Sequence, residues 1–304
     1  MELITFDYNK TYTLPKLVLA LGHFDGLHLA HQELIKKTVE LATTNNIKSA
    51  VITFDPHPDY VLKKRAPTGY ITPMKDKIAI FTTLGVDYLI IVPFTIKLSK
   101  MLSNEFEEII LGKFDIERIV IGFDYRYGYK GQGTKDTLKE RYPIYVMKEI
   151  TYKDEKIGSS LIRDMLINGE VEIVHKLLGQ YYYINGEIVS KERLSKASNF
   201  LVVKVSFSVD YHILKAGIYA SIITLDKNRL LGLTYYHINT SLNNQVDAQL
   251  EVYITDLLNN IYNKDIKIEF IKQLQTENNY LNKKDLLTQI SQNIEKLKLL
   301  KVDL

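Results

Sequence analysis

The alternation of short apolar runs with helical stretches constrains the first half of this chain more than any other feature. Apolar runs predict strands at Leu17–Leu21, 49–54, 88–92, 119–121 and Ile144–Met147. Between and after them, helical spacing predicts helices at 29–45, 75–84, 104–111, 159–167 and Val171–Leu178. Continuous apolar strands separated by helices are typical of a parallel sheet covered on both faces. The first half is therefore predicted to be a Rossmann-like α/β domain, with ligands at the carboxyl ends of its strands.

The pattern changes near Gly179. Strand-like segments then follow one another at 181–189, Phe200–Phe207, 218–224, 230–236, 250–255 and 266–270, and a helical stretch at 284–299 comes last. Several strands with a closing helix predict a small β-barrel. We therefore expect two domains, residues 1–180 and 181–304.

Composition excludes several function classes. The chain has no cysteine, which removes disulfides, thiolate nucleophiles and cysteine zinc sites. A net charge of +3 is too small to indicate nucleic acid binding. No apolar run approaches the roughly 20 residues of a membrane span, and residues 1–10 do not resemble a signal peptide. We expect a cytoplasmic protein with small-molecule ligands, no nucleic acid and no membrane partner, and leave weak self-association open.

The richest segment follows the first predicted strand, where a glycine turn leads into a helix. Gly22 and Gly26 allow the backbone to approach a ligand closely, and a helix N-terminus offers free N–H groups that suit a phosphate. His28 and His31 are three residues apart, so they share one face of the first turn. Surface histidines, helix caps or metal ligands are the alternatives, although no third metal ligand lies nearby in the sequence.

Two further segments follow predicted strands. Thr53-Phe54-Asp55-Pro56-His57-Pro58 forms a stiff loop, because proline cannot continue the sheet; taken alone, it is a rigid turn with an exposed histidine. In the segment from Gly122 to Gly128, Tyr125 can stack on a flat ring and Arg126 can pair with a phosphate. An ordinary turn with a surface pair between Arg126 and Asp124 is the simpler interpretation of that segment.

A fourth segment, residues 154–163, precedes a predicted helix. Ser159 and Ser160 are good N-caps, which requires no ligand. The alternative is a second anion-binding helix start, to which Arg163 adds positive charge.

Taken together, the four segments resemble the bacterial FAD synthetase family within the HIGH superfamily of nucleotidyltransferases. The family patterns are G-x-F-D-G-x-H-x-G-H-Q, T-F-D-P-H-P, G-x-D-F-R-F-G and I-S-S-T-x-I-R, in this order. The chain departs from these patterns at a few positions. Ala30 replaces a glycine, Tyr125 and Tyr127 replace phenylalanines, Gly158 replaces a serine and Ser160 replaces a threonine. The resemblance covers about the first 180 residues.

The resemblance implies an enzyme that transfers AMP from ATP to FMN, giving FAD and pyrophosphate, with Mg²⁺ accompanying ATP and no metal ligands from the protein. It implies catalytic roles for His28, His31, Ser160 and Arg163. The implied ATP-binding residues are these four with Gly22, Phe24, Asp25, Gly26 and Ser159. The implied FMN-binding residues are Phe54, Asp55, His57, Asp124, Tyr125 and Arg126.

The second half resembles the riboflavin kinase domain of the same family, but one motif is missing. Residues 216–220, 250–253 and 266–271 resemble kinase strands, and Glu251 stands where the resemblance implies the general base. The family's G-x-P-T-A-N segment, which helps hold Mg-ATP, has no counterpart in residues 190–199, and residues 235–239 have lost its N-I-G-x-R-P pattern. We predict a kinase-like domain with weak or no kinase activity.

Three rival interpretations stay open. The degraded second half suits a non-catalytic flavin-binding regulator. A related nucleotidyltransferase with another acceptor, such as nicotinamide mononucleotide or phosphopantetheine, is disfavoured by the T-F-D-P-H-P loop. Residues 97–100, Lys-Leu-Ser-Lys, resemble the K-M-S-K-S loop of aminoacyl-tRNA synthetases, but they lie far too early in the chain to support that assignment.

Overall fold

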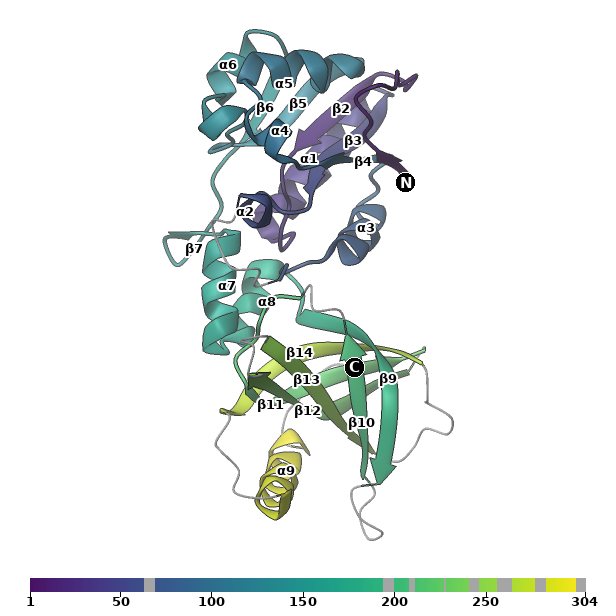
Figure 1. Cartoon of the computed structure of the whole chain (residues 1–304), viewed down its shortest axis with the longest axis vertical. Helices are drawn as coiled ribbons and strands as arrows, with labels where there is room; N and C mark the ends of the chain where they lie inside the picture. The colour runs from purple at the N-terminus through teal and green to yellow at the C-terminus, as the bar shows by residue number, and fades with distance from the viewer. Residues whose placement is uncertain are drawn as a thin grey trace. The chain divides into compact units, whose positions relative to one another are not determined.

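The computed structural model divides into two compact units, Met1–Ser159 and Ser160–Leu304 (Figure 1). It describes residues 1–62, 69–193, 200–207, 211–226, 228–240, 246–255, 264–276 and 283–298. The domain boundary expected at residue 180 stays a prediction. Each unit is described below by itself.

The first unit is built on a parallel sheet, which confirms the predicted fold class. Its strands in the described residues are β1 (Glu2–Thr5), β2 (Leu17–Leu21), β3 (Lys48–Asp55), β4 (Tyr88–Pro93), β5 (Ile116–Gly122) and β6 (Ile144–Met147), in the order β1-β4-β3-β2-β5-β6. Every neighbouring pair is parallel. The edge strand β1 was not predicted, because its mostly exposed, mixed sequence lacks a buried apolar run.

Helices cover both faces of this sheet. They are α1 (Leu29–Thr44), α2 (Pro58–Val61), α3 (Met74–Thr83), α4 (Ile96–Ser99), α5 (Ser103–Ile109) and α6 (Lys135–Lys139), with 3₁₀ turns at Leu111–Lys113 and Tyr129–Gly131. The helix predicted at 104–111 is therefore shorter, because the backbone of Ile110 (φ −102°) leaves the regular helix before the 3₁₀ turn. A short hairpin of β7 (Thr151–Tyr152) and β8 (Glu155–Lys156) follows the sheet.

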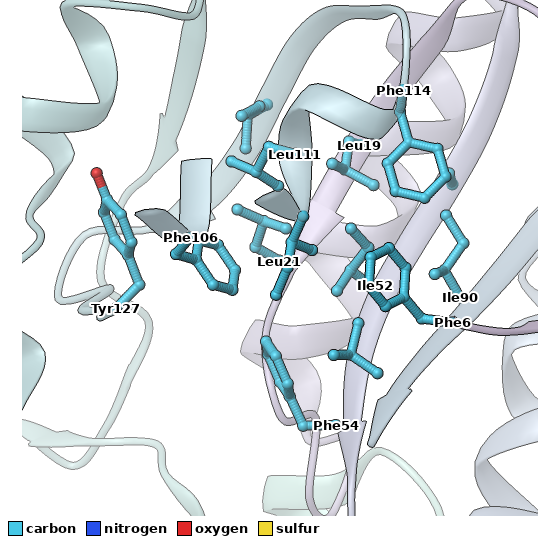
Figure 2. Close-up of a cluster of buried hydrophobic side chains, with 14 of the residues drawn as sticks. Phe6, Leu19, Leu21, Ile52, Phe54, Ile90, Phe106, Leu111, Phe114 and Tyr127 are labelled. Atoms are coloured by element: carbon cyan, nitrogen blue, oxygen red, sulfur yellow. The ribbon is translucent and has the colours of Figure 1, made fainter. Parts of the chain in front are cut away.

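Alternation along β2 assigns its side chains to two cores. Leu17, Leu19 and Leu21 lie in one cluster with residues of α4 and α5, and Figure 2 shows Leu19 and Leu21 among Ile52, Phe106 and Leu111 of that cluster. Val18 and Ala20 lie in the other, with residues of α1 and α3. Both sets are fully buried, as the continuous apolar run predicts for a strand covered on both faces.

The second unit is a closed barrel with helices, which confirms the other half of the fold prediction. In the described part of the unit, α7 (Ser159–Asn168) and α8 (Val171–Leu178) precede β9 (Tyr182–Arg193), β10 (Phe200–Phe207), β11 (Gly217–Leu225), β12 (Asn228–Thr240), β13 (Val246–Thr255) and β14 (Asp265–Thr276). Around the barrel the strands follow the order β10-β13-β12-β11-β14-β9. The last helix, α9 (Lys283–Lys298), packs Ile290 and Ile294 against apolar residues of β11 and β12.

Gly169 separates α7 from α8, as the Asn168-Gly169 pair predicts. Its φ of +80° lies in the left-handed region, where glycine is unstrained. No helix among the described residues is long and apolar enough to span a bilayer.

Candidate active site

The glycine turn lies at the point where the strand order of the parallel sheet reverses direction. β2 pairs with β3 on one side and with β5 on the other, and ligands of such sheets bind outside the carboxyl ends of these strands. Gly22 is required here, because a Cβ at this position would meet the Phe24 ring at 2.8 Å. Phe24 (φ 52°) and Leu27 (φ 41°) both have left-handed backbone conformations, and such strain clusters at functional sites.

His28 and His31 lie together at the start of α1. Their rings are stacked, with centroids 3.7 Å apart and an interplanar angle of 19°. His28 is the N-cap, and its Nδ1 accepts a hydrogen bond from the His31 backbone N–H at 3.4 Å. His28 therefore caps α1, which was one of the alternatives that the sequence left open. It leaves the proton of a neutral His28 on Nε2, which can donate to a ligand.

Burial keeps both imidazoles neutral. It lowers the pKa of His28 to about 4, an effect that Lys156 reinforces and Asp25 and Asp124 oppose. Burial also lowers the pKa of His31 well below its usual value, and His28 and Lys77 add to this effect. The Nδ1 atom of His31 is buried and has no hydrogen-bond partner within the described residues. The pair therefore offers hydrogen-bonding groups rather than fixed positive charge.

The fourth segment contacts the first. Ser159 Oγ donates a hydrogen bond to the backbone oxygen of Asp25 at 2.8 Å. The Asp25 side chain is buried, and its Oδ1 accepts a hydrogen bond from the backbone N–H of Thr72 at 3.3 Å. Asp25 therefore organises the loop from within, and Ser159 holds its backbone oxygen.

The second segment lies at the carboxyl end of β3. Phe54 is buried, and its ring centroid lies 5.0 Å from that of His23. Asp55 Oδ1 accepts a hydrogen bond from the hydroxyl of Tyr70 at 3.4 Å. His57 caps the short helix α2 through its Nδ1, which accepts from the backbone N–H of Asp59 at 3.2 Å. The predicted stiff loop is confirmed, but His57 is half-buried rather than exposed.

The third segment carries an ion pair that differs from the predicted surface pair between Arg126 and Asp124. Asp124 pairs with Lys156, whose Nζ also lies 5.1 Å from the centroid of the Phe123 ring. Arg126 is exposed, and the Tyr125 ring stacks on Tyr127 at 5.9 Å. The simpler interpretation, a surface pair between Arg126 and Asp124, is therefore wrong, because the ion-pair partner of Asp124 is Lys156.

The remaining predicted residues belong to the second unit. Ser160 is exposed at the first turn of α7. Arg163 is buried, with Nη1 3.1 Å from Nδ1 of His212. In the barrel, Glu251 Oε2 accepts a hydrogen bond from the Tyr253 hydroxyl at 3.0 Å, and its Oε1 lies 4.0 Å from Lys204 Nζ. The roles of these residues stay predictions.

Sequence reasoning missed three side chains near the histidine pair. His23 lies against Phe54 and His57, Lys77 is buried and donates to the His23 carbonyl at 2.9 Å, and Lys156 influences both members of the pair. His23 stands at a variable position of the family pattern, and Lys77 lies outside the four segments. Lys156 lies in the fourth segment, but before Ile157, where the family pattern begins. Of the three, only Lys77 could have been noticed in the sequence, because it interrupts an otherwise apolar face of the predicted helix.

Within the described part of the chain, no group of three or more histidine or carboxylate side chains could hold a metal ion.

Comparisons with known proteins assign both halves of the chain to the same flavin-related proteins. The family model for FAD synthetase matches residues 10–161, and the model for riboflavin kinase matches residues 178–300. Proteins named bifunctional riboflavin kinase/FMN adenylyltransferase are similar in sequence. Those of Listeria monocytogenes and Bacillus subtilis are each 32% identical, over 91% of this chain and 90% of their own. A third from Buchnera aphidicola of Acyrthosiphon pisum is 30% identical over 97% of this chain and 96% of its own.

A solved structure has the same fold. The crystal structure titled as a macrolide-efflux protein from Streptococcus pneumoniae superposes with a TM-score of 0.89, covering 99% of this chain and 100% of that one. At 20% sequence identity, this likeness supports the fold alone.

Proposed function

This chain belongs to the FAD synthetase family, and from that premise we propose that it transfers the adenylyl group of ATP to FMN. An oxygen of the FMN phosphate attacks the α-phosphorus of ATP. The bond between the α-phosphorus and the oxygen that bridges it to the β-phosphorus breaks, and pyrophosphate leaves. The products are FAD and pyrophosphate. No covalent intermediate on the enzyme is required.

The stacked histidine pair at the start of α1 carries this proposal. His28 has its proton on Nε2 and His31 is neutral, so both can donate hydrogen bonds to phosphate oxygens. Donors that are already in place where negative charge develops lower the barrier to phosphoryl chemistry. The free N–H groups of the helix start add a second set of donors.

The other implied residues complete the ATP side. Gly22, Phe24, Asp25 and Gly26 form the turn that admits the adenosine and α-phosphate, and Ser159, Ser160 and Arg163 hold the triphosphate. Mg²⁺ bound together with ATP would lower the charge repulsion met by the attacking FMN phosphate.

On the flavin side we propose Phe54, Asp55 and His57, with Asp124, Tyr125 and Arg126 from the third segment. The Phe54 ring offers an apolar surface for the flavin, and the exposed Arg126 can reach a phosphate. Asp124 pairs with Lys156 through its Oδ2.

Riboflavin kinase is the second candidate function, because its family model matches residues 178–300. The domain is present, but we propose that its activity is weak or absent. The basis is the missing P-T-A-N motif in residues 190–199, of which 194–199 lie outside the described residues. Glu251 alone cannot position Mg-ATP.

A product assay tests both proposals. Purified protein receives Mg-ATP with either FMN or riboflavin, and the flavins and pyrophosphate are quantified. We expect FAD and pyrophosphate in equal amounts from FMN, and no product from riboflavin. Absence of FAD from FMN would favour the non-catalytic flavin-binding alternative, while product from other mononucleotides would indicate a different acceptor.

ATP as substrate and the lack of cysteine suit a cytoplasmic location.

A further inference from the structure

His23 lies where the ATP-side turn meets the flavin-side loop. It directly follows Gly22, and its ring contacts Phe54 and His57 of the second segment, with centroids 5.0 and 5.4 Å apart. The ring of Phe94, just beyond β4, lies 6.2 Å away. His23 therefore joins the carboxyl ends of three neighbouring strands at one point.

The backbone of His23 is held firmly. Its carbonyl oxygen accepts one hydrogen bond from Thr53 Oγ1 at 3.1 Å and another from the buried Lys77 Nζ at 2.9 Å. The imidazole packs against neighbouring rings, but the fold does not use its Nδ1 as a hydrogen-bonding group. Its Nδ1 is buried and has no hydrogen-bond partner in the part of the chain that the structure describes. A buried polar atom without a partner is costly, and such atoms are retained where function uses them.

The imidazole is neutral at physiological pH. Burial lowers the pKa of His23 to about 3, and the positive potentials of His57 and Lys77 add to this effect. A neutral imidazole has one N–H donor and one acceptor. The residue as a whole is half-buried.

We propose that His23 contacts the phosphate of FMN and orients it toward the α-phosphorus of ATP. This inference rests on the proposed function. The FMN phosphate connects a flavin ring on the Phe54 side to the α-phosphate at the glycine turn, so it must pass the place where the two segments touch. His23 is the side chain at that place, and it brings an uncommitted N–H donor for the incoming oxygen.

The test compares steady-state kinetics of His23→Phe and His23→Asn with those of the unaltered protein. Phenylalanine keeps the aromatic packing against Phe54 but removes the donor, whereas asparagine keeps a donor. A hydrogen bond to a charged group corresponds to a roughly 10- to 100-fold effect. We expect His23→Phe to lower kcat/KM for FMN by about that factor, with the KM for ATP changed less than about twofold, and His23→Asn to retain more activity.

Lumiflavin, which has the flavin ring but neither ribityl chain nor phosphate, separates a phosphate contact from a ring contact. Its inhibition constant against FMN is expected to be the same in all three proteins. Parallel weakening of lumiflavin and FMN would overturn the proposal, as would an unchanged kcat/KM for FMN in His23→Phe. If His23→Phe does not fold, His23→Leu replaces it as the variant without a donor, and an unchanged kcat/KM for FMN in folded His23→Leu would overturn the proposal. Failure of the unaltered protein to form FAD would instead refute the proposed function.

Discussion

At the scale of single residues, His23, His28 and His31 are neutral because they are buried. The pKa of His28 falls to about 4 and that of His23 to about 3. A neutral imidazole does not attract a polyphosphate from a distance, but it donates a directed hydrogen bond once the phosphate is in place. We therefore expect these residues to affect turnover more than the affinity for ATP.

The lowered pKa of His28 predicts a loss of stability in acid. In the unfolded chain His28 binds a proton near pH 6.5, whereas in the folded chain it does so only near pH 4. The unfolded state therefore binds more protons within this window, and the free energy of unfolding falls as the pH drops through it. From pH 7 to pH 5 the contribution of His28 amounts to about 2 kcal/mol.

His28→Asn tests this linkage, because asparagine also caps helices but does not titrate. Urea unfolding followed by circular dichroism at pH 7 and pH 5 gives the free energies of unfolding. We expect the variant to lose less stability than the unaltered protein on acidification, by about 2 kcal/mol. Parallel losses in the two proteins would show that His28 is not the group that titrates.

Residue-scale prediction from the sequence succeeded where contacts are local. The three-residue spacing of His28 and His31 sufficed to place them on one helix face, and their rings are stacked. His23 and Lys77 were missed because their neighbours come from distant segments, namely β3 and the end of β2. Nothing in the local pattern at position 23 distinguishes a site residue from a turn residue.

At the scale of elements, the glycine turn depends on the absence of a side chain at position 22. A Cβ there would lie 2.8 Å from the Phe24 ring, which is buried against α3. Gly22→Ala is expected to destabilise the protein by about 1–3 kcal/mol, as overpacking does.

Gly158→Ala is the matched control, because a Cβ at position 158 meets nothing within 4 Å. Thermal unfolding of both variants measures the difference, and Gly158→Ala should lie close to the unaltered protein. Equal stability of the two variants would mean that the turn relaxes freely around Phe24.

The sequence predicted buried elements better than exposed ones. β2 and β3 carry continuous apolar runs that specify a strand covered on both faces. β1 has no such run and is paired only with β4, so its sequence gives little signal. Short helices such as α2 and α4 depend on single N-caps, His57 and Thr95, and their four residues are too few to show a helical period.

At the scale of the whole molecule, both units match family models. The proposal that the second has weak or no kinase activity rests on the missing P-T-A-N motif in residues 190–199. We expect riboflavin with Mg-ATP to yield no FMN above background. Glu251→Gln should then change neither this result nor the rate of FAD formation from FMN, since Glu251 lies in the barrel. FMN production that is lost in Glu251→Gln would show that the kinase works without the P-T-A-N motif.

The central claim is that the histidine pair of the parallel-sheet unit catalyses adenylyl transfer, and ATP labelled at the α-phosphorus tests it most directly. The unaltered protein is expected to move the label into FAD when FMN is supplied. In His31→Ala the rate should fall by about 100- to 1,000-fold, with the circular dichroism spectrum unchanged and with His175→Ala as a control that retains the rate. Full label transfer by folded His31→Ala would contradict the account.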